Sequence, residues 1–211
     1  MTSTVAIVWP CPLTVDEYES AGRDVDVPRP DCPTCSNPMI FWSGYSRVVR
    51  DGDDRRIWVR RSKCLPCRVT HCLLPAFCLL GRLYGVEVIG PAVAAIVDGR
   101  LTREVAEEAG FPYTTVRGWR RRHCDRAPTL AAGFAAVAVE LGVAAPALAA
   151  RAERAAMEAL GAAWAAARRR FSAVAGLWRF WSLVSGGAAL ATTTDTPWTS
   201  VGGRRLIPPT P

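Results

Sequence analysis

The segments DCPTCSNPM (31–39) and SKCLPCRV (62–69) each contain a Cys-x-x-Cys pair, and together they decide the fold of the N-terminal half. Two thiolates on one tight turn can hold one edge of a tetrahedral metal site, and a second such turn completes it. A small zinc ribbon buries little apolar surface, so the metal would supply much of its folding free energy. We expect a structural Zn²⁺, with no open position for a catalytic water, and its ligands are Cys32, Cys35, Cys64 and Cys67.

Other states of these residues also fit the sequence. The thiols could form two disulfides or remain without metal, and His71, Cys72 or Cys78 could replace one ligand. Zinc-binding turns usually place glycine directly after the second cysteine, where this chain has Ser36 and Arg68. Metal is favoured over disulfides because the eight cysteines occur in a chain without a recognisable signal peptide. We expect a cytoplasmic, nucleoid-associated protein. Small buried hydrophobic positions are expected for Cys11, Cys78 and Cys124.

The segment between the two cysteine pairs has the pattern of a β-hairpin. Residues 40–50 and 55–61 are rich in β-branched and aromatic side chains, and Asp51-Gly52-Asp53 separates them. Two antiparallel strands would bring both cysteine turns together despite the 28 residues between Cys35 and Cys64. The hairpin is basic, so it could follow a phosphate backbone or form a solvated sheet face; its cations are Arg47, Arg50, Arg55, Arg56, Arg60, Arg61 and Lys63.

The segment TREVAEEAGFPYTTVRGWRR (102–121) fits a helix-turn-helix. Ala106 is small enough for two helices to cross there, and Gly110 tolerates the positive φ that the turn needs. Val116 and Trp119 are spaced to fill the space between the helices. The alternative is a plain helical hairpin with a solvated basic face.

The second helix of such a motif enters the major groove of DNA with its N-terminal residues against base edges. The expected base contacts are Tyr113, Thr114, Arg117 and Arg121, and Arg117 suits a bidentate guanine contact best. Phosphate contacts are expected from Arg103, Arg120, Arg122 and Arg126, and on the hairpin from Arg55, Arg56 and Arg60. Thr102 is expected to cap the first helix.

The chain resembles an uncharacterised actinobacterial zinc-ribbon and helix-turn-helix family. The strings that carry this resemblance are WPCPLTVDEY (9–18), VPRPDCPTCSNPM (27–39), RRSKCLPCRVTHCLLPAF (60–77), GFPYTTVRGW (110–119) and GGAALATTTDTPWTSVGGRRLIPP (186–209). The N-terminal half is also similar to the zinc-binding and helix-turn-helix segments of insertion-sequence transposases. The resemblance implies a transposase-associated accessory factor or regulator.

A transposase would need three carboxylates that hold two metal ions for strand transfer. After Asp125 the chain has only Glu140, Glu153, Glu158 and Asp195, three on expected helices and one in the tail. We therefore expect no enzymatic activity.

Beyond residue 128 the chain becomes alanine-rich, and a heptad pattern follows. Its positions are spaced alternately three and four residues apart: Met157, Leu160, Trp164, Ala167, Phe171, Val174, Trp178 and Trp181. This seam could form a homodimer, or it could pack on the chain's own helix at 131–150. The Gly-, Thr- and Pro-rich residues from 186 onward are expected to be coil.

These observations predict an α+β protein that is mostly α. The expected divisions are an acidic arm (1–31), a zinc ribbon (32–80), a helix-turn-helix domain (82–127), an alanine-rich helical region (130–185) and a coil tail (186–211). Gly90-Pro91 is expected to kink or split the helix near residues 85–97.

The charge balance favours a polyanionic partner. The net charge is +7, and the basic residues are almost all arginine. A membrane role is disfavoured, because Glu140 and Pro146 interrupt the only apolar candidate span, residues 130–150. The expected function is sequence-specific binding of double-stranded DNA. The alternative is an adaptor that binds a transposase, a recombinase or another protein.

Overall fold

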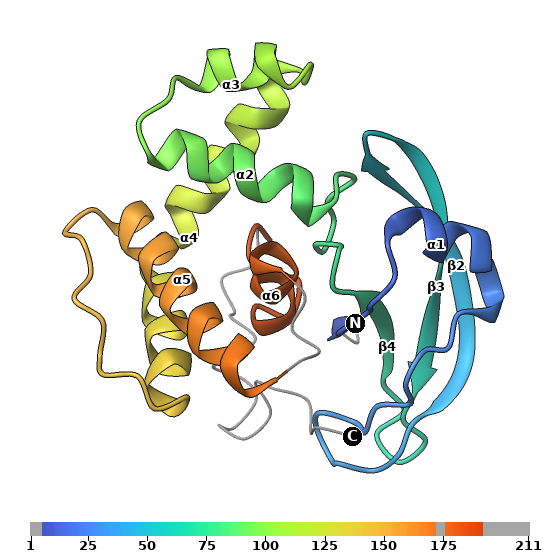
Figure 1. Cartoon of the computed structure of the whole chain (residues 1–211). Coiled ribbons are helices and arrows are strands. Elements are labelled where there is room, and N and C mark those ends of the chain that lie inside the picture. The colour runs from blue at the N-terminus through green and yellow to red at the C-terminus, as the bar shows by residue number, and fades with distance from the viewer. Residues whose placement is uncertain (1–5, 172–175, 192–211) are drawn as a thin grey trace.

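The computed structural model describes residues 6–171 and 176–191 (Figure 1). It is a mixed α/β structure, 46% helical and 19% strand, so helix dominates as expected. The strands are β1 (Ala6–Trp9), β2 (Ile40–Asp51), β3 (Asp53–Lys63) and β4 (Thr70–Pro75). The helices are α1 (Val15–Ala21), the 3₁₀ helix η1 (Gly22–Asp24), α2 (Val86–Val97), α3 (Thr102–Glu108), α4 (Tyr113–Glu140), α5 (Ala152–Arg170) and α6 (Leu177–Val184).

The four strands form one sheet in the order β1-β4-β3-β2. β2 and β3 are the expected antiparallel hairpin, and Gly52 makes its turn with φ 85°. β4 pairs antiparallel with the end of β3 at residues 61–63, and β1 pairs parallel with β4. The sequence analysis did not anticipate β1 and β4, because both are short and gain their stability from neighbouring strands.

The N-terminal residues, expected as an acidic arm (1–31), are part of this architecture, because β1 joins the sheet and α1 packs on β3. Beyond β1, helix α1 covers the edge of β3 that β4 leaves open. The backbone N–H of Arg56 donates to Glu19 Oε1 at 2.5 Å, and the Tyr18 hydroxyl donates to the Trp58 carbonyl at 3.2 Å. These contacts satisfy backbone groups that would otherwise expose an unpaired strand edge.

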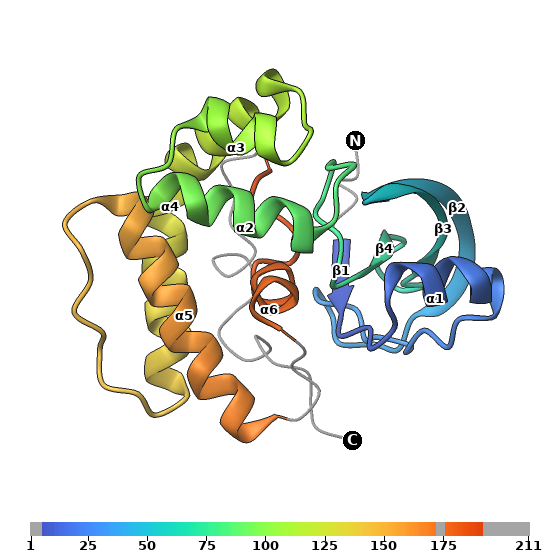
Figure 2. The same cartoon turned by 45° about the horizontal axis from the view of Figure 1, so that its top comes forward.

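The remaining helices form a second layer beside the sheet. α4 and α5 lie side by side, and α6 lies between this pair and the sheet in both views (Figures 1 and 2). α6 contacts β1, α2 and α5, and a single cluster of buried side chains extends from β1 to Leu190. No helix in the described part of the chain is long and apolar enough to cross a bilayer.

Two helix boundaries differ from the sequence prediction. α4 continues through Pro128 to Glu140, so the expected division between 82–127 and 130–185 lies inside one helix. Pro128 is exposed, and its nitrogen has no hydrogen to donate to the carbonyl of Cys124 one turn earlier. Gly90-Pro91 was expected to kink or split its helix, and it does not split it: α2 is one helix over Val86–Val97.

The heptad pattern does not form one continuous helix. α5 ends at Arg170, Phe171 is extended (φ −130°, ψ 110°), and α6 begins at Leu177. Val174 lies outside the described residues. α5 packs against α4 within the same chain, so its apolar face follows the intramolecular alternative.

The expected coil tail begins as part of the core. Ala188, Ala189 and Leu190 are buried, and the Gly187 carbonyl accepts a 2.8 Å hydrogen bond from the Leu80 N–H. Arg126 donates through Nε to the Ala191 carbonyl at 3.0 Å and is 7% exposed. The prediction of a phosphate contact at Arg126 was therefore wrong. Residues 192–211 lie outside the described residues.

Candidate metal centre and nucleic-acid interface

The hairpin brings the two cysteine turns together. The Sγ atoms of Cys32, Cys35, Cys64 and Cys67 all lie within 4.8 Å of one another, and those of Cys35 and Cys64 are 3.5 Å apart. A tetrahedral zinc site with Zn–S bonds of about 2.3 Å has sulfur–sulfur separations of about 3.8 Å. The four thiols therefore fit a tetrahedral metal ion, and the prediction that they gather at one site is confirmed.

Both turns adopt the left-handed conformation that this kind of site needs. Ser36 has φ 58° and Arg68 has φ 57°, although neither is glycine. Backbone hydrogen bonds hold the turns, since Ser36 N–H donates to the Cys32 carbonyl at 2.8 Å and Cys64 N–H to the Val69 carbonyl at 2.9 Å. Ser36 and Arg68 thus adopt the turn geometry that glycine usually adopts, at a higher conformational free energy than glycine would have.

The thiols differ in their proton affinity. Hydrogen bonds from the Asn37 side chain and backbone lower the pKa of Cys35 to about 6, and Asn37 Nδ2 lies 3.2 Å from Cys35 Sγ. The hydrogen bond between Cys67 and Cys35 raises the pKa of Cys67 to about 12. A bound cation would deprotonate all four thiols outright, because metal ligation favours the thiolate. The sequence analysis missed Asn37, although its position two residues after Cys35 was a usable signal.

None of the alternative ligands belongs to this cluster in the described chain. His71 and Cys72 lie on β4 and are buried, and Cys78 is buried after it. Cys11 and Cys78 are small buried residues as expected, at 2% and 0% exposure. Cys124 is half-buried, so that prediction was wrong for it. All eight cysteines are free thiols.

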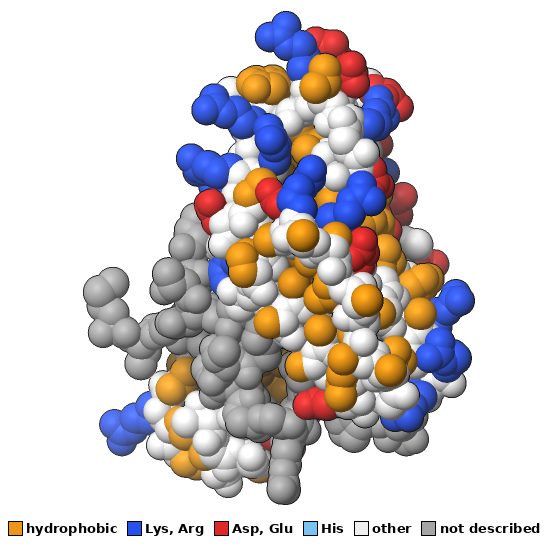
Figure 3. Space-filling model, turned by 90° about the vertical axis from the view of Figure 1, so that its left-hand side faces the viewer, with side chains coloured by type: hydrophobic (Ala, Val, Ile, Leu, Met, Phe, Trp, Pro, Cys, Tyr) orange, Lys and Arg blue, Asp and Glu red, His pale blue; other side chains and the backbone are white. Residues whose placement is uncertain are grey.

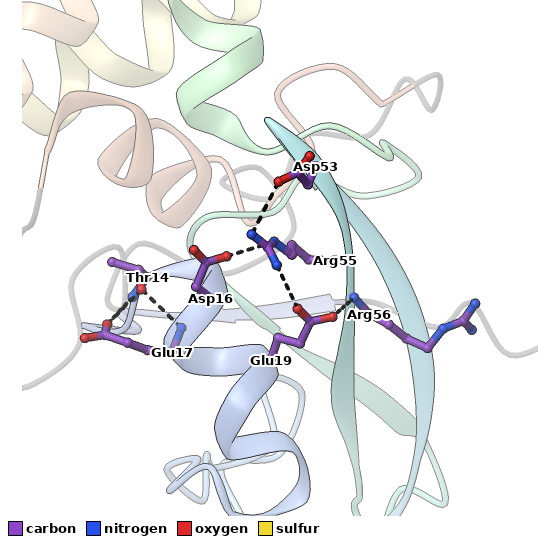
Figure 4. Close-up of polar contacts among 7 residues, drawn as sticks. All are labelled: Thr14, Asp16, Glu17, Glu19, Asp53, Arg55 and Arg56. Carbon is purple, nitrogen blue, oxygen red and sulfur yellow. Dashed lines mark hydrogen bonds and ion pairs between the residues drawn. The ribbon is translucent and has the colours of Figure 1, made fainter.

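The hairpin arginines are largely engaged within the chain. The Arg55 guanidinium lies among three carboxylates, with distances of 2.9 Å to Asp16, 3.6 Å to Glu19 and 3.5 Å to Asp53 (Figure 4). Figure 4 shows the Arg56 side chain pointing away from this group. Arg60 donates to the Arg23 carbonyl at 2.5 Å and lies over the Phe41 ring. Of the three hairpin residues expected to contact phosphate, only Arg56 therefore presents a free cation.

Two other hairpin cations have internal partners. Arg47 donates to the carbonyls of Leu79 and Arg82, which connects the hairpin to the segment before α2. Arg50 pairs with Asp54 at 2.7 Å. The basic composition of the hairpin is therefore mainly a structural property.

The segment 102–121 forms two helices joined by a turn. Gly110 has φ 68°, its N–H donates to the Glu107 carbonyl, and the Phe111 N–H donates to the Ala106 carbonyl. This pair of hydrogen bonds is a Schellman motif. The N-cap of α3 is Leu101, without a side-chain hydrogen bond, so the prediction of Thr102 as the cap was wrong. Thr102 is itself helical and buried.

The expected plug between the helices is buried. Ala106, Val116 and Trp119 are at most 3% exposed. Trp119 belongs to an aromatic group with Tyr84 and Phe111, whose ring centroids lie 5.1–5.7 Å apart in edge-on arrangements. This packing fixes the angle of α4 against α3.

The opposite side of α4 is exposed. Tyr113 is 46% exposed, and Thr114, Arg117 and Arg121 are exposed as well. At about 100° per residue these four positions share one sector of the helix. Figure 3 shows Lys and Arg side chains gathered on the upper part of one face of the molecule, with Asp and Glu side chains among them.

The other basic residues of the motif are placed differently. Arg103 is exposed on α3. Arg122 is half-buried and donates to the Gly118 carbonyl at 3.1 Å, so its guanidinium already has a partner. Arg120 is exposed and lines a cavity between the helices.

Residues 32–119 match a family model described as "Domain of unknown function (DUF6431)". This match covers the metal-binding cysteines, the hairpin, α2, α3 and the first turns of α4. No curated protein and no solved structure matches the chain. The chain thus contains a region similar to DUF6431, which combines the cysteine cluster with the α3–α4 helix pair.

Proposed function

We propose that this protein binds double-stranded DNA in a sequence-specific manner through the N-terminal half of α4. Tyr113, Thr114, Arg117 and Arg121 would contact base edges in the major groove, with Arg117 as a bidentate partner of guanine. Arg103 on α3 would contact phosphate. The cysteine site would hold one structural Zn²⁺, and no catalytic centre is proposed.

One observation carries this proposal: an exposed, basic face of α4 without internal partners. In the described part of the chain, no ion pair or hydrogen bond engages the side chains of Arg117 and Arg121. By contrast, Arg55 forms an ion pair with Asp16, and Arg47 donates a hydrogen bond to the Leu79 carbonyl. A guanidinium that is anchored on a rigid helix and left unpaired is suited to contact an external anion.

The packing of α4 on α3 also favours recognition of DNA bases. Trp119 and Val116 fix α4 on α3, so the exposed side chains stand on an ordered scaffold. Base recognition needs side chains positioned within a fraction of an ångström, which is easier on a packed helix than on a loop. The net charge of +7 would add sequence-independent attraction.

The test is a selection from random duplex DNA with zinc-loaded full-length protein. The enriched pool is then titrated at two salt concentrations. We expect a consensus sequence and an affinity that falls with salt, with log K decreasing by about 0.9 per phosphate contacted for each unit of log salt. Two inverted half-sites in the consensus would show that a dimer binds. No enrichment and no salt-dependent binding would contradict the proposal.

A protein-binding adaptor is the second candidate. The hairpin exposes Trp42 by 59% and Tyr45 by 39%, and aromatic side chains are enriched in protein interfaces. An adaptor would copurify with its partner and would show no DNA-sequence preference in the same selection. A role as a mobile-element accessory factor or transcriptional regulator, with a transposase or recombinase as partner, rests on the resemblance to insertion-sequence transposases alone.

A further inference from the structure

A cavity of about 410 Å³ lies where α2, α3, α4 and α5 come together. This volume is within the range of about 300–1,000 Å³ that is typical of small-molecule sites. The end of α2 and the residues before α3 form one wall, the middle of α4 a second, and the start of α5 a third. The DNA-binding proposal does not use this cavity.

The cavity has an excess of positive charge. Three arginines line it, Arg100, Arg120 and Arg151, against one acidic residue, Glu153. Arg100 pairs with Glu108, which is not in the lining. Arg151 Nε lies 3.6 Å from Glu153 Oε2, so the one carboxylate is already shared.

Arg120 is the cation left over. No ion pair or hydrogen bond engages its side chain in the described residues. An anion in the cavity would thus meet the Arg120 side chain without a competing internal partner.

The opposite wall is aliphatic. Val93, Ile96 and Val97 of α2 line the cavity, and Leu101 lines it while remaining 64% exposed to solvent. Val93, Ile96 and Val97 are at most 8% exposed, so Leu101 provides most of the apolar surface that water reaches. A purely inorganic anion would leave Leu101 in contact with water, whereas an organic anion could cover it. Burial of apolar surface stabilises a complex by about 25 cal/mol for each Å² removed from water.

We propose that this cavity binds a small organic carboxylate. The carboxylate pairs with Arg120, and a branched or aromatic apolar group lies on Ile96 and Leu101. Binding of such a ligand does not require that α4 contact DNA, so the site is tested in the absence of DNA.

The test is calorimetric titration of the zinc-loaded full-length protein with benzoate and with 3-methylbutanoate. Benzamide is the neutral control for benzoate, and inorganic phosphate is the control for charge without apolar surface. We expect saturable binding of at least one carboxylate, about tenfold or more tighter than that of benzamide or phosphate. Absence of saturable carboxylate binding at millimolar concentrations, or phosphate binding as tight as benzoate, would overturn the proposal.

Two variants locate the site. Arg120→Gln should weaken carboxylate binding by about tenfold or more, because it removes a charge-assisted hydrogen bond. Leu101→Asp should also weaken it through like-charge repulsion, and aspartate is well tolerated at the N-cap position that Leu101 occupies. Arg169→Gln makes the same change as Arg120→Gln at an exposed position of α5 outside the cavity, and should leave binding unchanged. Equal binding by wild type and Arg120→Gln would place the ligand elsewhere and overturn the proposal.

Discussion

Trp178 of α6 lies directly against Gly90 of α2. A Cβ atom built on Gly90 would lie 2.2 Å from Trp178 Cδ2, which is closer than side-chain atoms approach each other. In the sequence, Gly90-Pro91 resembles a helix break. In the fold, the glycine makes room for an indole ring that packs α6 against α2.

Gly90→Ala should therefore destabilise the protein by about 1–3 kcal/mol, because the added methyl group overlaps the Trp178 ring. Urea unfolding would measure the change. Gly161→Ala is the matched control: Gly161 is inside α5 with open space around its Cα, and alanine there should stabilise by about 0.5–1 kcal/mol. A Gly90→Ala protein as stable as wild type would show that the ring does not lie on the glycine.

Removal of one cysteine ligand should abolish stoichiometric metal binding. We expect about one Zn²⁺ per wild-type chain and none in Cys32→Ser, together with a large loss of stability, since structural zinc contributes about 10–16 kcal/mol of apparent binding free energy in zinc-finger peptides. Metal analysis and thermal unfolding would check both. Cys124→Ser, which changes a half-buried thiol outside the cluster, should keep the metal. One zinc retained by Cys32→Ser would contradict the ligand set.

Arg68→Gly should stabilise the metal-bound protein. Arg68 has φ 57°, a conformation that costs about 1–2 kcal/mol for a residue with a Cβ and little for glycine. Part of the gain is offset by the greater freedom of glycine in the unfolded chain, so we expect about 0.5–1 kcal/mol. Arg68→Val should act in the opposite direction, because β-branched residues are least tolerant of positive φ. Stabilisation by valine would exclude the left-handed turn.

Arg117→Ala should weaken binding to the selected DNA site by about 1–3 kcal/mol and relax the preference at one base pair. Fluorescence anisotropy with the consensus and single-base variants would measure it. Arg169→Ala, an exposed arginine of α5, serves as the control for lost charge. If Arg117→Ala lost the same affinity on every sequence, Arg117 would contact phosphate and not a base.

Stability should fall as the pH falls below about 6.5, in part because of His123. Burial lowers the pKa of His123, whose Nε2 lies 3.3 Å from the Glu153 carbonyl oxygen. Because the pKa of His123 is lower in the folded protein than in the unfolded chain, the unfolded chain binds a proton at higher pH. Lowering the pH therefore stabilises the unfolded chain relative to the folded protein, and the free energy of unfolding falls.

Urea unfolding between pH 7.5 and 5.5 at saturating Zn²⁺ would test this expectation. His123→Gln should show a shallower dependence on pH than wild type, whatever its stability at pH 7.5. The only other histidine, His71, is the same in both proteins. Parallel curves for the two proteins would rule out a contribution from His123.

Local patterns were sufficient for part of this structure. The β-hairpin followed from β-branched runs around Asp51-Gly52-Asp53, and the α3–α4 turn followed from the spacing of Ala106 and Gly110. Cys-x-x-Cys spacing identified the cluster, because two residues between thiols fit one tight turn. These features depend on neighbours along the chain, whose geometry the peptide backbone itself restricts.

The sequence by itself therefore determined the cysteine cluster, the hairpin and the exposed basic face of α4. Tertiary structure alone decided the partners of residues distant in the chain: β1 beside β4, Asp16 and Glu19 around Arg55, and Trp178 on Gly90. It also decided that Pro128 lies within a helix and that the heptad pattern is divided into α5 and α6. The physical reason is that packing energy between distant segments outweighs the local preferences that a single sequence reveals.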